Sequence, residues 1–303
     1  MPRIKQRKKI YDPRVWPTWA LLGCAWLLVR LPIGGLYWLG TRMGGLLYRV
    51  ARSRRHITEV NLALCFPELD RVARDALTRD SFTHTAIGAL ETLMVWLNPG
   101  RNVTGRTRAQ GVEHLRDAIA LGRGVVLVGG HFTAMDIIAP TLAELDFDVI
   151  YRENRNPAWE WLQVNGRRRF FDGVIERENT REILRRLKAG RAIWYAADQD
   201  YGRKHSLFAP FFGVKAATIN ATARLARFNR SPIVFMSHYR DLKTCTWSIH
   251  FHPRIEDFPG GDDIEDAARI NRILEDAIRL HPEQYLWMHR RFKTRPEGEP
   301  RLY

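Results

Sequence analysis

The sequence predicts an α/β fold in which a largely parallel sheet carries helices on both faces, preceded by an N-terminal hydrophobic helix. Beyond residue 122, short apolar runs alternate with helical patterns, and before residue 40 a long apolar run follows a basic start. The 303 residues suffice for one large domain with an appendage. No Gly/Ser-rich or Pro-rich linker divides the chain, so we expect residues 1–45 to form a basic terminus with a hydrophobic membrane anchor, and residues 46–303 one domain.

The anchor is predicted from charge and hydropathy. The first eleven residues hold five basic side chains and no acidic one, and the run over 16–39 is apolar apart from Thr18, Arg30 and its glycines. A spanning helix needs about 20 mostly apolar residues, which this run reaches, but Arg30 and Pro32 interrupt it. The run could therefore span a bilayer or lie along its interface. A secretory signal peptide is the other reading, disfavoured because no A-x-A-like cleavage site follows.

The overall charge predicts an anionic partner. Lys and Arg number 48 and Asp and Glu 33, a formal charge of +15, which attracts polyanions without distinguishing nucleic acid, anionic lipid and an acidic protein. The three cysteines, Cys24, Cys65 and Cys245, match neither a CxxC pair nor a zinc-ligand spacing. A reducing compartment without disulfides is the simplest interpretation.

The remaining elements follow from periodicity. One long helix is expected over 68–97, then strands over 124–129, 147–152, 192–197, 232–239 and 246–253, and helices over 133–145, 180–189, 217–228 and 264–280. In open α/β sheets, ligands bind outside the carboxyl ends of the strands. The residues that directly follow each strand are therefore the candidates for a functional site.

The turn after the first of these strands holds the main candidate for chemistry. Gly129 and Gly130 precede His131, and Asp136 follows five residues later. A carboxylate beside an imidazole fixes its tautomer and makes it a general base, so we expect Asp136 to hold His131. Gly130 would let a substrate approach the backbone. A second reading stays open, in which Thr133 and Asp136 form a capping box and His131 is only a turn residue.

Basic residues follow the second strand. Arg152 stands at its end, and Arg167, Arg168 and Arg169 lie downstream. The planar fork of a guanidinium pairs with two phosphate oxygens, so these residues suit phosphate recognition. A solvated basic helix face is the alternative for Arg168 and Arg169.

Acidic and aromatic residues follow the third strand. Asp198 and Asp200 would orient Arg167 or His131 or bind a metal, the metal being disfavoured because no further ligand cluster accompanies them. A loop over 208–213 contains Phe208 and Phe211, which would wall an acyl chain or simply pack in the core.

Together these motifs resemble a known family. The chain is similar to the late acyltransferases of lipid A biosynthesis, the lauroyl and myristoyl transferases, within the lysophospholipid (glycerolipid) acyltransferase superfamily marked by HxxxxD or HxxxxE. The resemblance covers nearly the whole chain and rests on the N-terminal hydrophobic anchor and on segments 54–56, 61–67, 130–136, 194–202, 211–214 and 282–296. Lys215 and Asn220 depart from the residues usual in the family, which puts lipid selectivity rather than chemistry in question.

The resemblance implies roles for the candidate residues. His131 and Asp136 match the family's catalytic pair, Arg167 its functional arginine and Asp198 the aspartate of its Asp-x-Asp block. Substrate contacts are expected from Gly130, Arg152, Asp200, Phe208 and Phe211. No metal or other cofactor is expected.

The resemblance also implies substrates and a location. The donor would be acyl carrier protein, and the acceptor a hydroxyl of a hydroxyacyl chain on a phosphorylated glycolipid, a lipid A precursor of the Kdo2-lipid IVA type. His131 would deprotonate this hydroxyl for direct attack on the thioester. Such a donor places the catalytic domain on the cytoplasmic side of the bacterial inner membrane, with no role for nucleic acid.

Two rival functions remain open from the sequence. One is a glycerophospholipid acyltransferase that acts on lysophosphatidate, because HxxxxD by itself does not exclude it. The other is a non-catalytic basic protein that binds membranes or nucleic acid, for which the charge of +15 would be the whole explanation.

Overall fold

The computed structural model describes residues 10–303, so the basic N-terminal residues at positions 3–9 lie outside the described part. Seven strands form one sheet in the order β1-β9-β8-β2-β5-β3-β4. Their bounds are β1 Thr107–Gln110, β2 Val125–Gly129, β3 Phe147–Tyr151, β4 Val174–Glu176, β5 Ala192–Ala196, β8 Ile233–Asp241 and β9 Thr246–Phe251. The pairs from β8 to β4 are all parallel and β9 is antiparallel to β8, which confirms the largely parallel sheet.

Helices cover both faces of the sheet, as expected. The inner strand β2 is buried along its whole length, and its side chains alternate between two cores. Leu127 packs in a core with residues of α5 and α8, and Val128 packs in a second core with residues of α9, α10 and α11. The bounds are α4 Arg52–Cys65, α5 Arg71–Leu97, α6 Val112–Ala120, α7 Ala139–Leu142, α8 Pro157–Arg167, α9 Thr180–Lys188, α10 Ala221–Asn229 and α11 Asp263–Leu280.

Side-chain caps fix where several helices begin. The Asp70 carboxylate accepts a hydrogen bond from the backbone N–H of Ala73 at 2.8 Å and starts α5. Asn156 caps α8, and Asp262 caps α11. Each cap satisfies an N–H group that the first turn of a helix leaves without a partner.

The N-terminal run folds as two helices rather than one. α2 spans Trp16–Leu28 and α3 spans Ile33–Val50, with Pro32 at the start of α3. The residue before a proline is disfavoured in the helical conformation, so the chain turns at Leu31. Over residues 10–303, no helix combines the length and apolarity that crossing a membrane requires. The single spanning helix considered for 16–39 is therefore not found.

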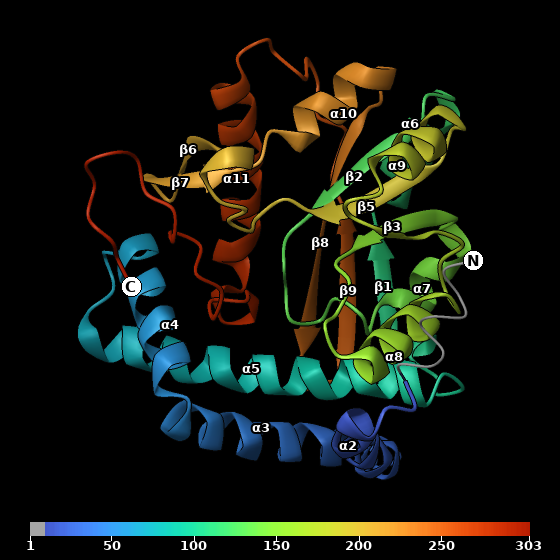
Figure 1. The fold of residues 1–303 in the computed structure, drawn as a ribbon, viewed down its shortest axis with the longest axis vertical. Helices are drawn as coiled ribbons and strands as arrows, with labels where there is room; N and C mark the ends of the chain where they lie inside the picture. The colour runs from blue at the N-terminus through green and yellow to red at the C-terminus, as the bar shows by residue number, and fades with distance from the viewer. Residues whose placement is uncertain (1–9) are drawn as a thin grey trace.

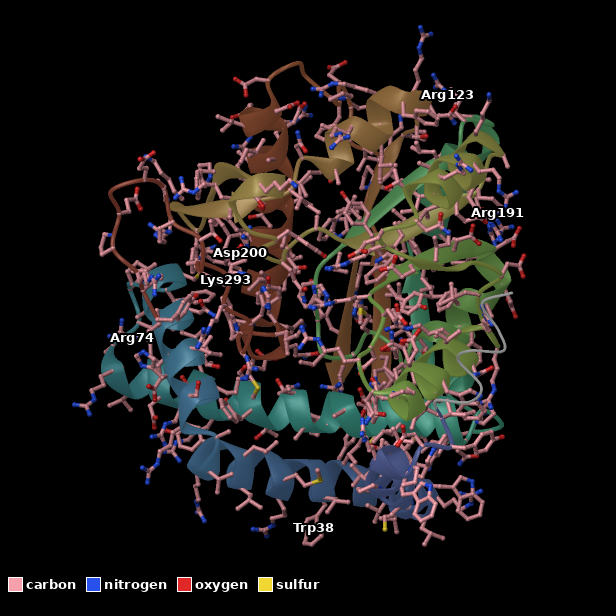
Figure 2. All side chains as sticks on the ribbon, in the orientation of Figure 1. Trp38, Arg74, Arg123, Arg191, Asp200 and Lys293 are labelled. Atoms are coloured by element: carbon pink, nitrogen blue, oxygen red, sulfur yellow. The ribbon has the colours of Figure 1, made fainter. Side chains whose placement is uncertain are left out.

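α3 packs along α5 on the side away from the sheet, as Figure 1 shows at its lower edge. The contact depends on glycine: a Cβ at Gly40 would lie 2.6 Å from Ile87 Cγ1, and a Cβ at Gly44 would lie 2.6 Å from Thr83 Cα. The opposite side of α3 is apolar and exposed, with Trp38 62% and Leu46 58% exposed. Figure 2 shows Trp38 projecting away from the rest of the chain.

Three local predictions were wrong in detail. The helix expected over 133–145 begins only at Ala139, because residues 133–138 form turns. The aromatic loop over 208–213 is part of a hairpin, β6 Leu207–Phe211 and β7 Val214–Thr218, packed on α11. The helix expected from 217 therefore begins at Ala221, as α10.

Candidate active site

The turn at residues 130–136, here called the His131 turn, emerges at the carboxyl end of β2. Its position is set by backbone bonds: His131 N donates to Asp198 Oδ2 at 2.8 Å, and Leu286 N donates to the His131 carbonyl at 3.0 Å. Gly130 packs closely on α11, since a Cβ there would lie 2.5 Å from Leu274 Cδ1 and would force that side chain to move. These contacts hold in place the turn that the sequence predicted to be functional.

Both ring nitrogens of His131 have partners from the segment after β5. Nδ1 lies 2.6 Å from Asp198 Oδ1, and Nε2 lies 3.1 Å from the Gln199 side-chain nitrogen. Burial raises the pKa of Asp198, but the His131 ring and its hydrogen bonds outweigh this and hold that pKa well below its usual range. An ionised Asp198 accepts the Nδ1 proton, so Nε2 keeps the lone pair that a general base needs.

Asp136 holds a different residue from the one expected. Its carboxylate accepts two hydrogen bonds from Arg167, from Nε at 2.8 Å and from Nη2 at 3.1 Å. Burial lowers the pKa of Arg167, and the charge of Asp136 more than restores it. The prediction that Asp136 fixes the His131 ring is therefore wrong, because Asp198 has that contact, and the capping box with Thr133 is not formed because no helix starts there.

A buried network of hydrogen bonds and one ion pair holds the His131 turn in place. Thr133 N donates to the Gln284 carbonyl at 2.8 Å, and Arg240 Nη1 donates to Thr133 Oγ1 at 3.2 Å. Arg240 in turn forms a buried ion pair with Glu91 of α5, with Nε donating at 2.7 Å. Glu91 also accepts from Tyr37 of α3 at 2.8 Å. A chain of polar contacts thus joins the outer helix α3 to the turn that carries His131.

A cavity of about 1120 Å³ opens in front of His131. Arg152 and Arg167 line it, as the sequence predicted for a phosphate site, and Arg177, Lys204 and Arg224 also line it, against the single acidic residue Glu178. Its apolar lining comes from Met135, Ile150, Ile183, Leu184, Trp194, Leu207, Ile219, Ala221, Leu225 and Phe228. The cavity therefore suits a ligand with an anionic part and a hydrocarbon part.

Asp200 lies outside this lining. Its carboxylate accepts from Thr294 N at 2.6 Å, from Thr294 Oγ1 at 2.9 Å and from Gly202 N at 2.8 Å. Figure 2 shows it beside Lys293, in the C-terminal segment. These contacts use Asp200 to fasten the C-terminal segment, rather than for the substrate contact expected from the sequence.

The two aromatic candidates are also absent from the lining. Phe211 is 0% exposed and packs against Phe292 and Tyr285, which is the core-packing alternative left open by the sequence. Phe208 lies on β6 with the Arg203 guanidinium 5.8 Å from its ring centroid. Core packing therefore accounts for Phe211, and neither side chain is part of the cavity lining.

Several site residues were missed from the sequence. Gln199 could have been noticed because it stands between two aspartates, and Glu91 because it is a lone acidic residue in an apolar helical stretch. The apolar lining from α9 and α10 carries no sequence signal, because it arises only when two helices pack. Within residues 10–303, no cluster of three His, Cys, Asp or Glu side chains could hold a metal ion.

Comparison with known proteins adds to this geometry. Residues 3–294 match the model of a family described as bacterial lipid A biosynthesis acyltransferase. The chain is 38% identical to the lipid A biosynthesis palmitoleoyltransferase of Escherichia coli K12, over 100% of this chain and 99% of that one. It is 39% identical to the lauroyltransferase of the same organism, over 97% of each chain.

Among solved structures, the crystal structure of a 1-acyl-sn-glycerophosphate (LPA) acyltransferase from Thermotoga maritima aligns with a TM-score of 0.37. The identity is 13%, over 77% of this chain and 98% of that one. This likeness is too weak to bear on fold or function.

Proposed function

Since this chain belongs to the bacterial lipid A biosynthesis acyltransferase family and is an acyltransferase, we propose that it moves a fatty acyl chain from acyl carrier protein to a hydroxyl of a hydroxyacyl chain on a lipid A precursor of the Kdo2-lipid IVA type. Family membership excludes the rival in which the chain is a non-catalytic binding protein. The observation that carries the proposal is the placement of a base, His131, and a half-buried guanidinium, Arg167, together on one amphipathic cavity.

The proton steps follow from the contacts of His131. With Asp198 bound at Nδ1, Nε2 takes the proton of the acceptor hydroxyl as its oxygen attacks the thioester carbonyl. The tetrahedral adduct collapses as the carbon–sulfur bond breaks, and the thiolate takes the proton back from the imidazolium. The Gln199 side-chain nitrogen lies beside Nε2, and the acceptor hydroxyl would bind next to it. No covalent acyl-enzyme is required.

Arg167 would stabilise the negative charge that develops on the carbonyl oxygen. Asp136 engages its Nε and Nη2, so Nη1 would be the donor available to an oxyanion in the cavity that Arg167 lines. A donor aimed at an oxyanion lowers the activation barrier by about 2.7 to 4 kcal/mol in a water-excluded site. The pairing with Asp136 would keep the guanidinium in place while charge develops.

Charge supports the choice of substrates. Five of the six charged residues along the cavity, apart from the imidazole, are basic: Arg152, Arg167, Arg177, Lys204 and Arg224. Both a phosphorylated glycolipid and an acidic carrier protein complement them. A carrier-protein donor would place the catalytic domain on the cytoplasmic side of the inner membrane.

The membrane contact would be made by the outer faces of α2 and α3. Exposed apolar side chains gather there, with Trp38 and Leu46 on α3 and Trp26 and Leu27 on α2. An amphipathic helix with such a face lies in the headgroup region with its apolar side buried. The two helices would therefore hold the enzyme on the surface where its acceptor resides.

Vesicle co-sedimentation tests the membrane contact. The double variant Trp38→Ser, Leu46→Ser should lose most of its binding to phosphatidylglycerol vesicles, because it removes apolar area from α3. Val72→Ser, at a still more exposed apolar position on α5 (78% exposed), is the control and should bind like the parent. Equal binding by all three proteins would contradict the assignment.

An acyl-transfer assay tests the function itself. The full chain is given lauroyl carrier protein with either Kdo2-lipid IVA or lysophosphatidate, and products are identified by mass spectrometry. We expect transfer to the glycolipid, and a loss of more than 10³-fold in His131→Ala. Preferential transfer to lysophosphatidate, or full activity in His131→Ala, would overturn the proposal.

A further inference from the structure

The cavity extends well beyond the reacting groups, into a groove between two helices. This α9–α10 groove is lined by Ile183, Leu184, Ile219, Ala221, Leu225 and Phe228. Along α10, the three lining residues 221, 225 and 228 share one face of the helix. Arg224, the one charged residue of α10 in the lining, is exposed, so its head group can reach solvent at the rim.

The direction of the groove follows from how α10 is fastened. Near its start, the Thr222 hydroxyl hydrogen-bonds with the Tyr195 hydroxyl, close to the carboxyl end of β5 where His131 and Asp198 lie. At its end, the Asn229 side chain donates to the carbonyls of Arg123 at 2.6 Å and Leu187 at 3.1 Å. Arg123 precedes β2, so this end of α10 lies at the opposite edge of the sheet.

α9 runs the same way, because it follows β4 and precedes β5. The groove therefore leads from the catalytic edge toward the opposite edge of the sheet. From Ala221 to Phe228 it is seven residues long, or about 10 Å at 1.5 Å per residue. Phe228 is the last lining residue along that path, and its ring is 50% exposed.

Resting on the proposed function, we propose that the α9–α10 groove holds the acyl chain of the donor and that Phe228 closes its far end and so selects chain length. The carbonyl end of the chain lies at His131, and the methyl end meets the Phe228 ring. A chain in the groove covers apolar surface that is otherwise exposed, which favours binding in proportion to the area covered. The contact with the acyl chain, which the sequence assigned to Phe208 and Phe211, is thus made by the residues that line the α9–α10 groove.

Two substitutions change the groove in opposite senses. Phe228→Ala opens the far end, and Leu225→Trp fills the groove one turn closer to His131. Leu280→Ala on α11 is the control, because Leu280 is 67% exposed and lies outside the lining. None of the three residues is one of the proposed catalytic groups.

The measurement is the relative kcat/KM for carrier proteins charged with decanoyl, lauroyl, myristoyl and palmitoyl chains. In Phe228→Ala, the ratio of longer to shorter donors should rise by about fourfold for each methylene that gains room. Leu225→Trp should shift the ratio toward shorter donors, and Leu280→Ala should leave it unchanged. Equal loss on all donors, or no change in the ratio, in a Phe228→Ala protein of unchanged melting temperature would overturn the proposal.

A second experiment does not depend on turnover. Carrier protein charged with a myristoyl chain that bears a terminal diazirine is irradiated with the His131→Ala protein, and the labelled peptide is mapped by mass spectrometry. Label on the peptide that contains residues 221–229 supports the groove, and label elsewhere refutes it. Lack of transfer from every carrier protein by the unmodified enzyme would instead refute the proposed function, so the two failures are distinguishable.

Discussion

The two carboxylates of the site serve two different cations. Asp198 lies at the imidazole, and its pKa is held well below the usual range by that contact, although burial alone would raise it. Asp136 lies at the guanidinium of Arg167 through two hydrogen bonds. The base and the oxyanion donor are therefore oriented independently, and substitutions should separate their effects.

Asp198→Asn tests the first of these pairs. An amide can donate to Nδ1 as well as accept from it, which would move the proton to Nε2 and remove the lone pair. We expect kcat to fall by about 10³- to 10⁴-fold with KM little changed. Steady-state kinetics on both substrates provide the measurement, with circular dichroism as the control for folding. A fall of less than tenfold would mean that Asp198 does not set the tautomer.

A double-mutant cycle tests the second pair. Asp136→Asn and Arg167→Lys each disturb the same bidentate contact, since lysine cannot reproduce the planar fork. We expect each to reduce kcat by about 10²-fold, and the double variant to lose little more, because one contact is being removed twice. Additive losses would show that the two residues act separately.

The sequence predicted the members of this site better than their partners. His131 and Asp198 directly follow β2 and β5, as the rule that ligands bind at the carboxyl ends of strands predicts, and Arg167 reaches Asp136 from the last turn of α8. Which carboxylate meets which cation depends on side-chain directions in turns, which have no periodicity. The HxxxxD spacing suggested a His131–Asp136 contact only on the assumption that the turn continues as a helix.

At the scale of elements, α5 acts as the support of the His131 turn. Gly88 of α5 packs directly on that turn, since a Cβ there would lie 2.2 Å from the Thr133 carbonyl oxygen. Three residues along, Glu91 is bound to Arg240, which donates to the Thr133 hydroxyl. Because α3 packs on the far side of α5, this one helix lies between the outer helices and the turn.

Gly88→Ala tests this support. The new methyl group would push the Thr133 backbone away, and we expect a loss of about 1 to 3 kcal/mol in unfolding free energy together with a lower kcat. Gly45→Ala on α3 is the matched control, because nothing lies within 4 Å of a Cβ there. It should be neutral or slightly stabilising, since alanine favours a helix interior. Chemical denaturation and turnover by both variants provide the comparison.

Some elements were not foreseen for a physical reason. The three-residue strand β4 and the exposed strand β1 are too short or too polar to show alternation, and they pair only because neighbouring strands offer an edge. The α10 pattern was extended backward to 217 because alanines suit a helix, whereas pairing with β6 holds Ala216 and Ala217 in a strand. Tertiary pairing overrode local preference in each case.

At the scale of the whole molecule, the buried histidines His84 and His238 and the half-buried His289 couple stability to pH. Burial lowers the pKa of His238 to about 4, and burial likewise lowers that of His289 to about 4. Burial, reinforced by the charge of Arg240, lowers the pKa of His84 to about 4. In the unfolded chain a histidine titrates near 6.5, so between pH 6.5 and 4 the unfolded state binds more protons than the folded one.

The sign of the effect follows directly. Stability from these residues is complete above about pH 6.5 and is lost as the pH falls toward 4, at about 1.4 kcal/mol per pH unit for each group. The unfolding free energy measured with urea should therefore decline steeply between about pH 7 and pH 4. In His238→Gln this decline should be smaller by the contribution of one histidine, about 1.4 kcal/mol per pH unit. The exposed residue His56 offers the control, His56→Gln, which should keep the slope of the parent. If the unfolding free energy of His238→Gln depends on pH as steeply as that of the parent, His238 does not contribute to the pH dependence of stability.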